Sequence, residues 1–382
     1  MNYLPLHGGE SQHIEQLVKE FCRDFIRKDF EKFAHDKRFP REVFEKMGEL
    51  GFLGAMISEE YGGAGMSMRE YAVLMECLAC YGGGSIALTL TAHHSLAATH
   101  IVYAGTEEQK RTYLPKLASG EMIGAWCLTE PNAGSDAFGE GMKTTATLTD
   151  DGWLINGPKQ FITNASVADV YLVVAKINPG DSKNYGVFIV PRVSKGNIQC
   201  RPETNKIGMH ASDTAALIFE NVEVDIDAKM EDDGRKSTRK VINSGRVGIS
   251  ALACGLMRSA LSEAIAYAKE RRAFGKAIAD HQGVSFPLAD AYSECLASWA
   301  MTKNTALAVD EGHLSPELSA ATKLKTTRSA FDGCLVAMDV FGGSGYMGEC
   351  RASQDLLDAR LLRVGEGTDN MQRLTIAKEL FY

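Results

Sequence analysis

The residue best suited to proton transfer lies in the segment 363–372. There Glu366 stands between two glycines, just before a stretch that favours the start of a helix. Asp369 and Gln372 have the spacing of a capping box, so we expect the last helix to begin there, with Glu366 just outside its N-terminus. The positive end of a helix favours an ionised carboxylate, and the flanking glycines leave room for a substrate. Glu366 is therefore a candidate general base, or a charge that only complements the helix dipole.

Two other segments place small or aromatic residues at the end of a predicted strand. The first, Trp126–Asp136, ends in a polar loop whose backbone N–H groups could hold phosphate or flavin oxygens. The second, Phe161–Asn164, offers an aromatic face beside a hydroxyl, which suits a flat heterocycle. A simple transition from strand to turn explains each segment equally well.

A glycine motif and a basic helix end are also candidates. Gly343–Gly348 matches GxGxxG, but it follows a predicted helix instead of a strand, which argues against a Rossmann site. Its bare backbone could approach a ligand or simply end the helix. Arg271, in the last turn of a long predicted helix, could cap that helix or bind a phosphate.

We expect no metal site. Cys77 and Cys80 form a CxxC pair in a helical stretch, without the second pair that a zinc site requires. His93 and His94 have no carboxylate at ligand spacing. The nine cysteines are scattered and odd in number, as in proteins with reduced thiols, so we expect a cytoplasmic location.

The amino-acid composition and charge limit the classes of partner that this chain can bind. Of 382 residues, 45% are hydrophobic and 24% charged, which excludes a disordered or collagen-like chain. The net charge is −8 and no basic block occurs, so we expect no nucleic-acid partner. The apolar run Ile249–Met257 is far shorter than the ~20 residues of a membrane span, and residues 1–16 lack signal-peptide character. We expect no membrane partner.

The hydrophobic periods predict a mainly α protein with a central β-domain. Helical spacing extends over 11–117, interrupted at Pro40 and at 61–65, and predicts an N-terminal helical domain over residues 1–121. A period of two dominates 123–224 and predicts a β-domain over 122–234, with an antiparallel sheet or small barrel.

Within the β-domain we expect hairpin turns at 150–152 and 156–157. Four further helical runs predict an antiparallel four-helix bundle over residues 235–382. These runs are 241–272, 284–311, 316–340 and 370–380.

Taken together, these segments resemble the acyl-CoA dehydrogenase family over essentially the whole chain, in the family's order and spacing, and most closely its short-, medium- and branched-chain members. The segments that carry the resemblance are Leu128–Asp136, Asn156–Asn164, Lys206–Asp213, Arg271–Lys276 with Gln282, Phe341–Gly345, Gly365–Thr368 and Gln372–Ala377. The resemblance implies a three-domain homotetramer that binds FAD.

The resemblance also implies a reaction, the α,β-dehydrogenation of an acyl-CoA to the trans-2-enoyl-CoA. By position Glu366 would remove the α-proton while flavin N5 accepts the β-hydride, and an electron-transfer flavoprotein would take the electrons. Some family members carry their base at the position of Gly245, which has no side chain to serve here. Two alternatives stay open: an acyl group tethered to a carrier protein, and a redox-inactive flavin-binding scaffold.

Site residues follow from the same resemblance. Flavin contacts fall on Trp126, Leu128, Thr129, Gly134, Ser135, Phe161, Thr163, Thr368 and Asn370. Contacts to the ADP part of a neighbouring subunit's FAD fall on Arg271, Phe274, Gln282, Asp339, Gly342 and Gly343. The CoA thioester would lie along Ser135, Asn243, Arg246 and Gly367.

Three of these positions depart from the family pattern. Asp339 replaces a common glutamine, Phe161 a common tryptophan, and Asn370 a longer side chain. A negative Asp339 would repel a pyrophosphate, so we expect weaker FAD binding or a displaced loop.

Overall fold

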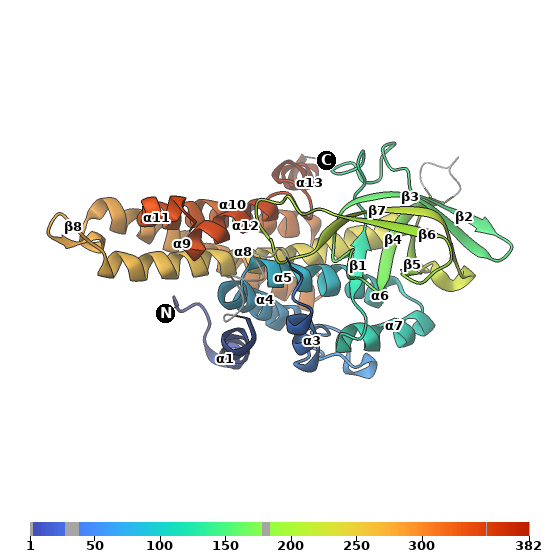
Figure 1. Ribbon diagram of the computed structural model, residues 1–382, viewed down its shortest axis with the longest axis horizontal. Coiled ribbons are helices and arrows are strands. Elements are labelled where there is room, and N and C mark those ends of the chain that lie inside the picture. The colour runs from blue at the N-terminus through green and yellow to red at the C-terminus, as the bar shows by residue number, and fades with distance from the viewer. Residues whose placement is uncertain (1–2, 27–37, 178–183, 349, 382) are drawn as a thin grey trace.

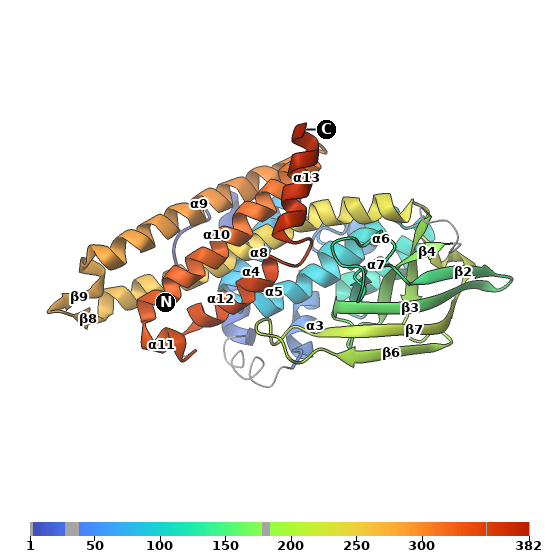
Figure 2. The ribbon, with the colours of Figure 1, turned by 90° about the horizontal axis from the view of Figure 1, so that it is seen from above.

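The computed structural model describes residues 3–26, 38–177, 184–348 and 350–381 (Figure 1). Helices from both ends of the chain adjoin a curled sheet, and the molecule is elongated. The sheet lies at one end of the long axis, and a small hairpin, β8 (Arg272–Ala273) with β9 (Lys276–Ala277), lies at the other (Figures 1 and 2).

The N-terminal region is helical, as the period of its apolar residues predicts. Side-chain capping boxes begin two of its helices, Ser67 with Glu70 and Thr106 with Gln109. The helices are α1 (Gln12–Phe21), α3 (Arg41–Glu49), α4 (Met68–Gly82), α5 (Gly84–Leu90), α6 (Thr99–Ala104) and α7 (Glu107–Ser119), with the π-helical segments η2 (Cys22–Ile26) and η4 (Thr91–Ala98).

The central sheet has the order β1-β4-β2-β3-β7-β6, with β5 also on β4. Its strands are β1 (Gly124–Cys127), β2 (Thr145–Thr149), β3 (Gly152–Thr163), β4 (Val170–Ile177), β5 (Tyr185–Pro191), β6 (Asn197–Pro202) and β7 (Thr214–Val224). Antiparallel pairs predominate, as expected, but β4 pairs with β1 and β2 in parallel. The long connections between these strands allow the parallel pairing.

One of the two predicted turns is wrong. Gly152 pairs with Thr149 across the expected β2–β3 hairpin. Asn156–Gly157 instead lies inside β3, at a shift in its register against β7. At Gly157 φ is +139°, and an added Cβ would lie 2.4 Å from the Thr144 Cα, so glycine serves a bulge with a close backbone approach.

The C-terminal bundle consists of α8 (Gly234–Glu270), α9 (Gln282–Asp310), α10 (Pro316–Phe341) and α12 (Arg351–Leu362), with the short α11 (Gly343–Tyr346) between the last two. The expectation that the final run forms the fourth bundle helix is wrong. That run, α13 (Asp369–Phe381), contacts α10 but projects from the bundle (Figure 2). The run 351–362 is the fourth helix because it packs on both α8 and α10.

Among the described residues, α8 is the one helix long and apolar enough to cross a membrane. The most apolar window of α8 has a mean hydropathy of 1.3, and 83% of that window is buried inside the protein. Such burial is that of the core helix of a bundle.

A buried ion pair fixes the loop that follows β1. The Lys159 ammonium, fully buried on β3, donates to Glu130 Oε1 at 2.8 Å and to the carbonyls of Leu128 and Val174. Glu130 also accepts the backbone N–H of Thr144. Burial favours protonation of Glu130, yet Lys159 and these hydrogen bonds hold its pKa below the usual value.

Removing the cation of this pair should destabilise the protein strongly. In Lys159→Met the Glu130 carboxylate stays buried without its counter-charge, so we expect the free energy of unfolding to fall by about 3–5 kcal/mol. Chemical denaturation measures the change. Lys195→Met, which removes an exposed partner of Glu223, is the control and should leave stability nearly unchanged. Equal stabilities of the two variants would contradict the assignment.

Candidate active site

The loop between α12 and α13 holds Glu366 in a left-handed conformation, with φ +52°. Side chains from three helices bind the carbonyl oxygens of this loop. Gln372 Nε2 donates to the carbonyls of Glu366 at 3.1 Å and Gly367 at 2.8 Å. Lys323 Nζ donates to the Gly367 carbonyl at 2.7 Å, and Arg246 Nε to the Glu366 carbonyl at 3.4 Å. These contacts offset the backbone strain at Glu366.

The predicted capping box at the start of α13 is wrong by one residue. The Thr368 hydroxyl, not the Asp369 carboxylate, accepts a backbone N–H of the first turn, that of Met371, at 3.3 Å. Asp369 pairs with Arg363 at 2.6 Å, and Gln372 binds the preceding loop. The loop is therefore fastened from inside the last helix.

The Glu366 carboxylate is buried against α8. Glu366 as a whole is partly exposed, but both carboxylate oxygens are buried and have no hydrogen-bond partner among the described residues. A Cβ added to Gly245 would lie 2.9 Å from Oε2 and 3.2 Å from Oε1. Gly245 is thus needed to make room for the carboxylate.

Burial raises the pKa of Glu366 to about 7, although Arg246 and Lys323 favour its ionised form. That the helix end keeps this carboxylate ionised stays a prediction, because desolvation favours the protonated form while the nearby cations favour the charged form. A carboxylate that titrates near neutral pH can both take up and release a proton there.

A buried hydroxyl pair continues the same face of α8. One turn beyond Gly245, a Cβ added to Gly248 would lie 3.2 Å from Ser95 Oγ and 3.4 Å from the Tyr71 ring, and the hydroxyls of these two residues lie 2.6 Å apart. Burial raises the pKa of Tyr71, and the negative charge of Glu366 adds to the rise. The carboxylate therefore lies close to this pair.

Sequence reasoning missed Lys323, Tyr71 and Ser95. Tyr71 and Ser95 give no local signal, since a tyrosine and a serine are common inside helices. Lys323 shares a face of α10 with small residues at helical spacing, Ser319, Thr326 and Thr327, and a lysine among them was the available clue.

The residues predicted to bind the CoA thioester are brought together only in part. Asn243, Arg246 and Gly367 adjoin the Glu366 loop, with Asn243 Oδ1 accepting a hydrogen bond from Arg246 Nη1 at 3.0 Å. Ser135 is exposed in the loop after β1.

Most residues predicted to contact the flavin ring lie on two adjacent strand ends. The Gln160 N–H donates to the Thr129 carbonyl at 2.8 Å, which joins the loop after β1, with Leu128, Gly134 and Ser135, to the end of β3. Phe161 sits at a register shift of β3, is 66% exposed and has φ +57°. An exposed ring on strained backbone is the feature to expect where a ligand binds.

The other predicted flavin residues surround these strand ends or lie on α13. Trp126 donates from its indole to His100 Nδ1 at 2.9 Å, and Thr163 ends β3 half-buried. Thr368 caps α13 and Asn370 is exposed in its first turn.

The residues predicted to contact the ADP part of a neighbouring subunit's FAD lie far from these strand ends. Arg271, Phe274 and Gln282 lie at the β8–β9 end of the bundle, the end opposite the sheet, and Asp339, Gly342 and Gly343 lie where α10 meets α11 (Figures 1 and 2). All six are exposed, and Phe274 is 95% exposed. One chain does not bring them to the strand ends.

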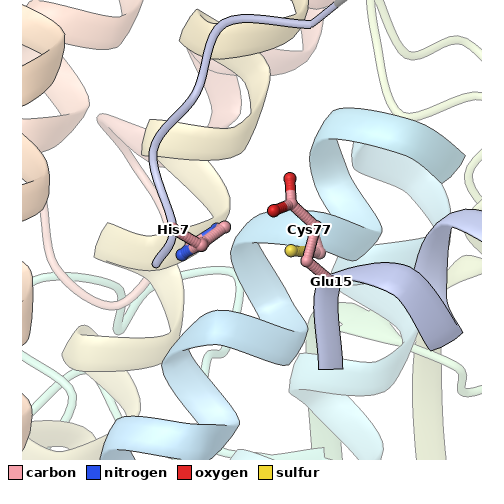
Figure 3. A group of neighbouring side chains, drawn as sticks. All are labelled: His7, Glu15 and Cys77. Carbon is pink, nitrogen blue, oxygen red and sulfur yellow. The ribbon is translucent and has the colours of Figure 1, made fainter. Parts of the chain in front are cut away.

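A cluster of His7, Glu15 and Cys77 has ligand atoms within 4.8 Å of one another (Figure 3). The Arg258 guanidinium already occupies this cluster. It donates to Glu15 at 2.8 Å and doubly to Glu76, which also lies 2.7 Å from His7 Nε2. A metal cation would be repelled there, so we interpret the cluster as an ion-pair network joining the N-terminal segment to α4 and α8.

The adjacent histidines are structural too. His93 binds the Leu117 carbonyl and the Gly124 N–H, and His94 binds the Leu53 carbonyl and the Met56 N–H. Burial lowers their pKa values to about 4 and about 3. Neutral rings with both nitrogens engaged have no lone pair left for a metal.

Comparison with known proteins decides the family. The acyl-CoA dehydrogenase N-terminal, middle and C-terminal domain models match residues 9–121, 125–222 and 232–381. The chain belongs to the acyl-CoA dehydrogenase family. A probable acyl-CoA dehydrogenase of Bacillus subtilis is 39% identical over 97% of this chain and 98% of its own length.

Solved structures of the family share the whole fold. The butyryl-CoA dehydrogenase of Megasphaera elsdenii is 31% identical, with a TM-score of 0.94 over 99% of this chain and 100% of its own. A glutaryl-CoA dehydrogenase of Mycobacterium smegmatis in complex with FADH2 is 28% identical, with a TM-score of 0.93 over 98% and 95%. The protein is accordingly an oxidoreductase of the acyl-CoA dehydrogenase type.

The contact between Gly245 and Glu366 can be tested directly. In Gly245→Ala the new methyl would lie 2.9 Å from Oε2, so the carboxylate must move. We expect FAD content and melting temperature near wild type, with flavin reduction by acyl-CoA slowed about 100-fold. Gly8→Ala, where a Cβ meets nothing within 4 Å, is the control. A wild-type rate in Gly245→Ala would show that the carboxylate is not held there.

The titration of Glu366 near pH 7 makes two linked predictions. If Glu366 is the base, kcat/KM should rise as pH passes about 7, because this profile reports the free enzyme. Because the folded-state pKa lies above the unfolded value, the stability due to the protonated form is complete below pH about 4.5 and is lost as pH rises through 7.

Glu366→Gln should therefore raise the melting temperature, relative to wild type, more at pH 8 than at pH 5. Thermal unfolding at the two pH values measures it. A difference that does not depend on pH would contradict the raised pKa.

Proposed function

We propose that this protein converts an acyl-CoA thioester to the trans-2-enoyl-CoA, with Glu366 as the base that removes the α-proton. The observation that carries the proposal is a carboxylate held against Gly245, with two buried oxygens that have no partner in the described part of the chain. Its burial raises its pKa to about 7. A group that only complemented a helix dipole would not need such burial. The same observation argues against a redox-inactive scaffold.

FAD fits the residues present. An exposed Phe161 on strained backbone offers a stacking surface, and the small-residue loop after β1 offers backbone N–H groups beside it. Trp126, Leu128, Thr129, Gly134, Ser135 and Thr163 would hold the ring system, with Thr368 and Asn370 from α13. When bound, FAD supplies the acceptor for the β-hydride.

The α-proton of a thioester is too weakly acidic for an ordinary carboxylate, so the site must favour the negative charge that develops on the substrate. Arg246 and Lys323 provide positive charge beside Glu366, and the loop carbonyls they bind fix the carboxylate before the substrate arrives. Burial excludes water, which strengthens these interactions.

The thioester would run along Asn243, Arg246 and Gly367, with Ser135 at the flavin side. Its acyl chain would then lie beyond the Glu366 carboxylate, and the closely packed Gly248, Tyr71 and Ser95 would bound its pocket on the α8 side.

We also propose a homotetramer, in which the exposed residues at the β8–β9 end reach the ADP part of a neighbouring subunit's FAD. Their distance from the strand ends of their own chain supports this arrangement (Figure 1). Asp339 would weaken that contact by its charge. An electron-transfer flavoprotein is the proposed electron acceptor. None of the nine cysteines, all within the described ranges, forms a disulfide, which fits a cytoplasmic location.

The experiment that tests the proposal is Glu366→Gln. We expect the variant to fold and to bind FAD, but flavin reduction by acyl-CoA should fall by about 100- to 10,000-fold, the usual contribution of a general base. Stopped-flow absorbance of the flavin measures the rate. Glu379→Gln, on the exposed face of α13, is the control. Unchanged reduction in Glu366→Gln would reject the base assignment.

The same assay separates CoA from a carrier-protein tether. Wild-type protein is mixed with short, branched, cyclic and long acyl-CoA thioesters, and with the same acyl groups on a phosphopantetheinyl carrier protein. Reduction by acyl-CoA supports the proposal. Reduction only by the carrier-bound forms would replace it with carrier-protein oxidation.

A further inference from the structure

Two lysines are fully buried in the described part of the chain, and they differ in what balances their charge. Lys159 has a carboxylate partner, Glu130, at 2.8 Å. Lys323, on α10, is 0% exposed, yet no carboxylate in the described ranges lies within 4.0 Å of its Nζ. Its hydrogen bond goes to the uncharged Gly367 carbonyl at 2.7 Å. Burying an ammonium without a direct counter-ion is costly.

The hydrogen bond to Gly367 does not explain why the Lys323 ammonium is buried despite this cost. The Gly367 carbonyl already accepts the Gln372 amide at 2.8 Å, so it would be satisfied without the lysine. An apolar side chain of similar size would fill the same space more cheaply. What Lys323 adds is a positive charge beneath the loop that carries Glu366.

Four charged groups, from α8, the end of α12, the following loop and the start of α13, act on Lys323. Glu366 and Asp369 favour its charged form, whereas Arg246 from α8 and Arg363 at the end of α12 oppose it. Asp369 and Arg363 pair with each other at 2.6 Å. Arg246 is engaged with Asn243 and the Glu366 carbonyl. The negative charge left for Lys323 to balance is that of Glu366.

We propose that Lys323 is a positioning residue for the base: its ammonium fastens the Gly367 carbonyl and, by its charge, keeps the Glu366 carboxylate ionised at neutral pH. The inference rests on the proposed role of Glu366. Burial lowers the pKa of Lys323 to about 8, so the ammonium is still charged where Glu366 must lose its proton.

The test removes the charge in two ways. Lys323→Met keeps the volume, and Lys323→Gln also keeps a donor for the Gly367 carbonyl. In both, loss of the cation raises the pKa of Glu366, so we expect the midpoint of the kcat/KM profile to move up by about one pH unit. At pH 6, below both midpoints, kcat/KM then falls about tenfold, and it approaches wild type at high pH. Lys323→Arg, which keeps the charge, should restore the wild-type midpoint.

Lys325→Met is the matched control. Lys325 lies two residues along the same helix, is partly exposed and pairs with Glu294. Its removal should leave the midpoint unchanged.

A second readout does not depend on turnover. The infrared difference between each protein and its Glu366→Gln counterpart isolates the carboxyl band of residue 366, which can be titrated directly. It should show the same upward shift in Lys323→Met and Lys323→Gln.

The outcomes are distinct. A uniform loss of activity at all pH values, with the carboxyl titration unmoved, would show a purely structural lysine and overturn the inference. If Glu366→Gln reduces flavin like wild type, the base assignment itself fails, whatever the lysine variants do. Should Lys323→Met not fold, Lys323→Gln and the infrared titration still decide.

Discussion

The site depends on keeping one carboxylate dry and still able to ionise. Desolvation drives Glu366 toward its protonated form, while Arg246 and Lys323 oppose it, and the balance lies near pH 7. A more exposed carboxylate would be too weak a base, and one buried without cations would stay protonated. The compromise requires two bundle helices, α8 and α10, and the last helix, α13, to meet at one loop. Gly245 on α8 leaves room for the oxygens, Lys323 on α10 provides charge, and Gln372 on α13 fixes the backbone.

The bundle also places two separate surfaces at its two ends. At one end α8 lies beside the sheet. There the Phe161 ring is exposed, and the Glu366 carboxylate lies against Gly245 of α8. At the other end α8 leads into the β8–β9 hairpin, with Phe274 almost entirely exposed (Figure 1). A rigid helix of 37 residues keeps these two surfaces at a fixed separation, which a second subunit could bridge.

Local sequence patterns predicted the helical ends, most strands and Glu366 itself, because a glutamate between glycines before a helix is visible within ten residues. Where the prediction failed, a contact with another segment determined the local structure. Asn156–Gly157 has turn chemistry, but the close approach of Thr144 makes it a bulge inside β3. The predicted capping box does not form, because the Asp369 carboxylate pairs with Arg363 and the Gln372 amide binds the Glu366 and Gly367 carbonyls. Lys323 matters through a carbonyl 44 residues further along the chain, and Tyr71 through Ser95, 24 residues away, and no local period reveals such contacts.

The two buried lysines differ in whether the fold compensates the free-energy cost of burying a charge, and this difference separates a structural lysine from a functional one. Lys159 is paired, accepted by two further carbonyls, and its site is neutral as a unit, so the free energy of burial is recovered within the fold. Lys323 shares its single acceptor, the Gly367 carbonyl, with Gln372, and the charge it faces is that of Glu366, the proposed base. When Glu366 is protonated, the ammonium is left unbalanced. The fold therefore carries a strain that only ionisation of Glu366 relieves, which is the electrostatic bias a buried base requires.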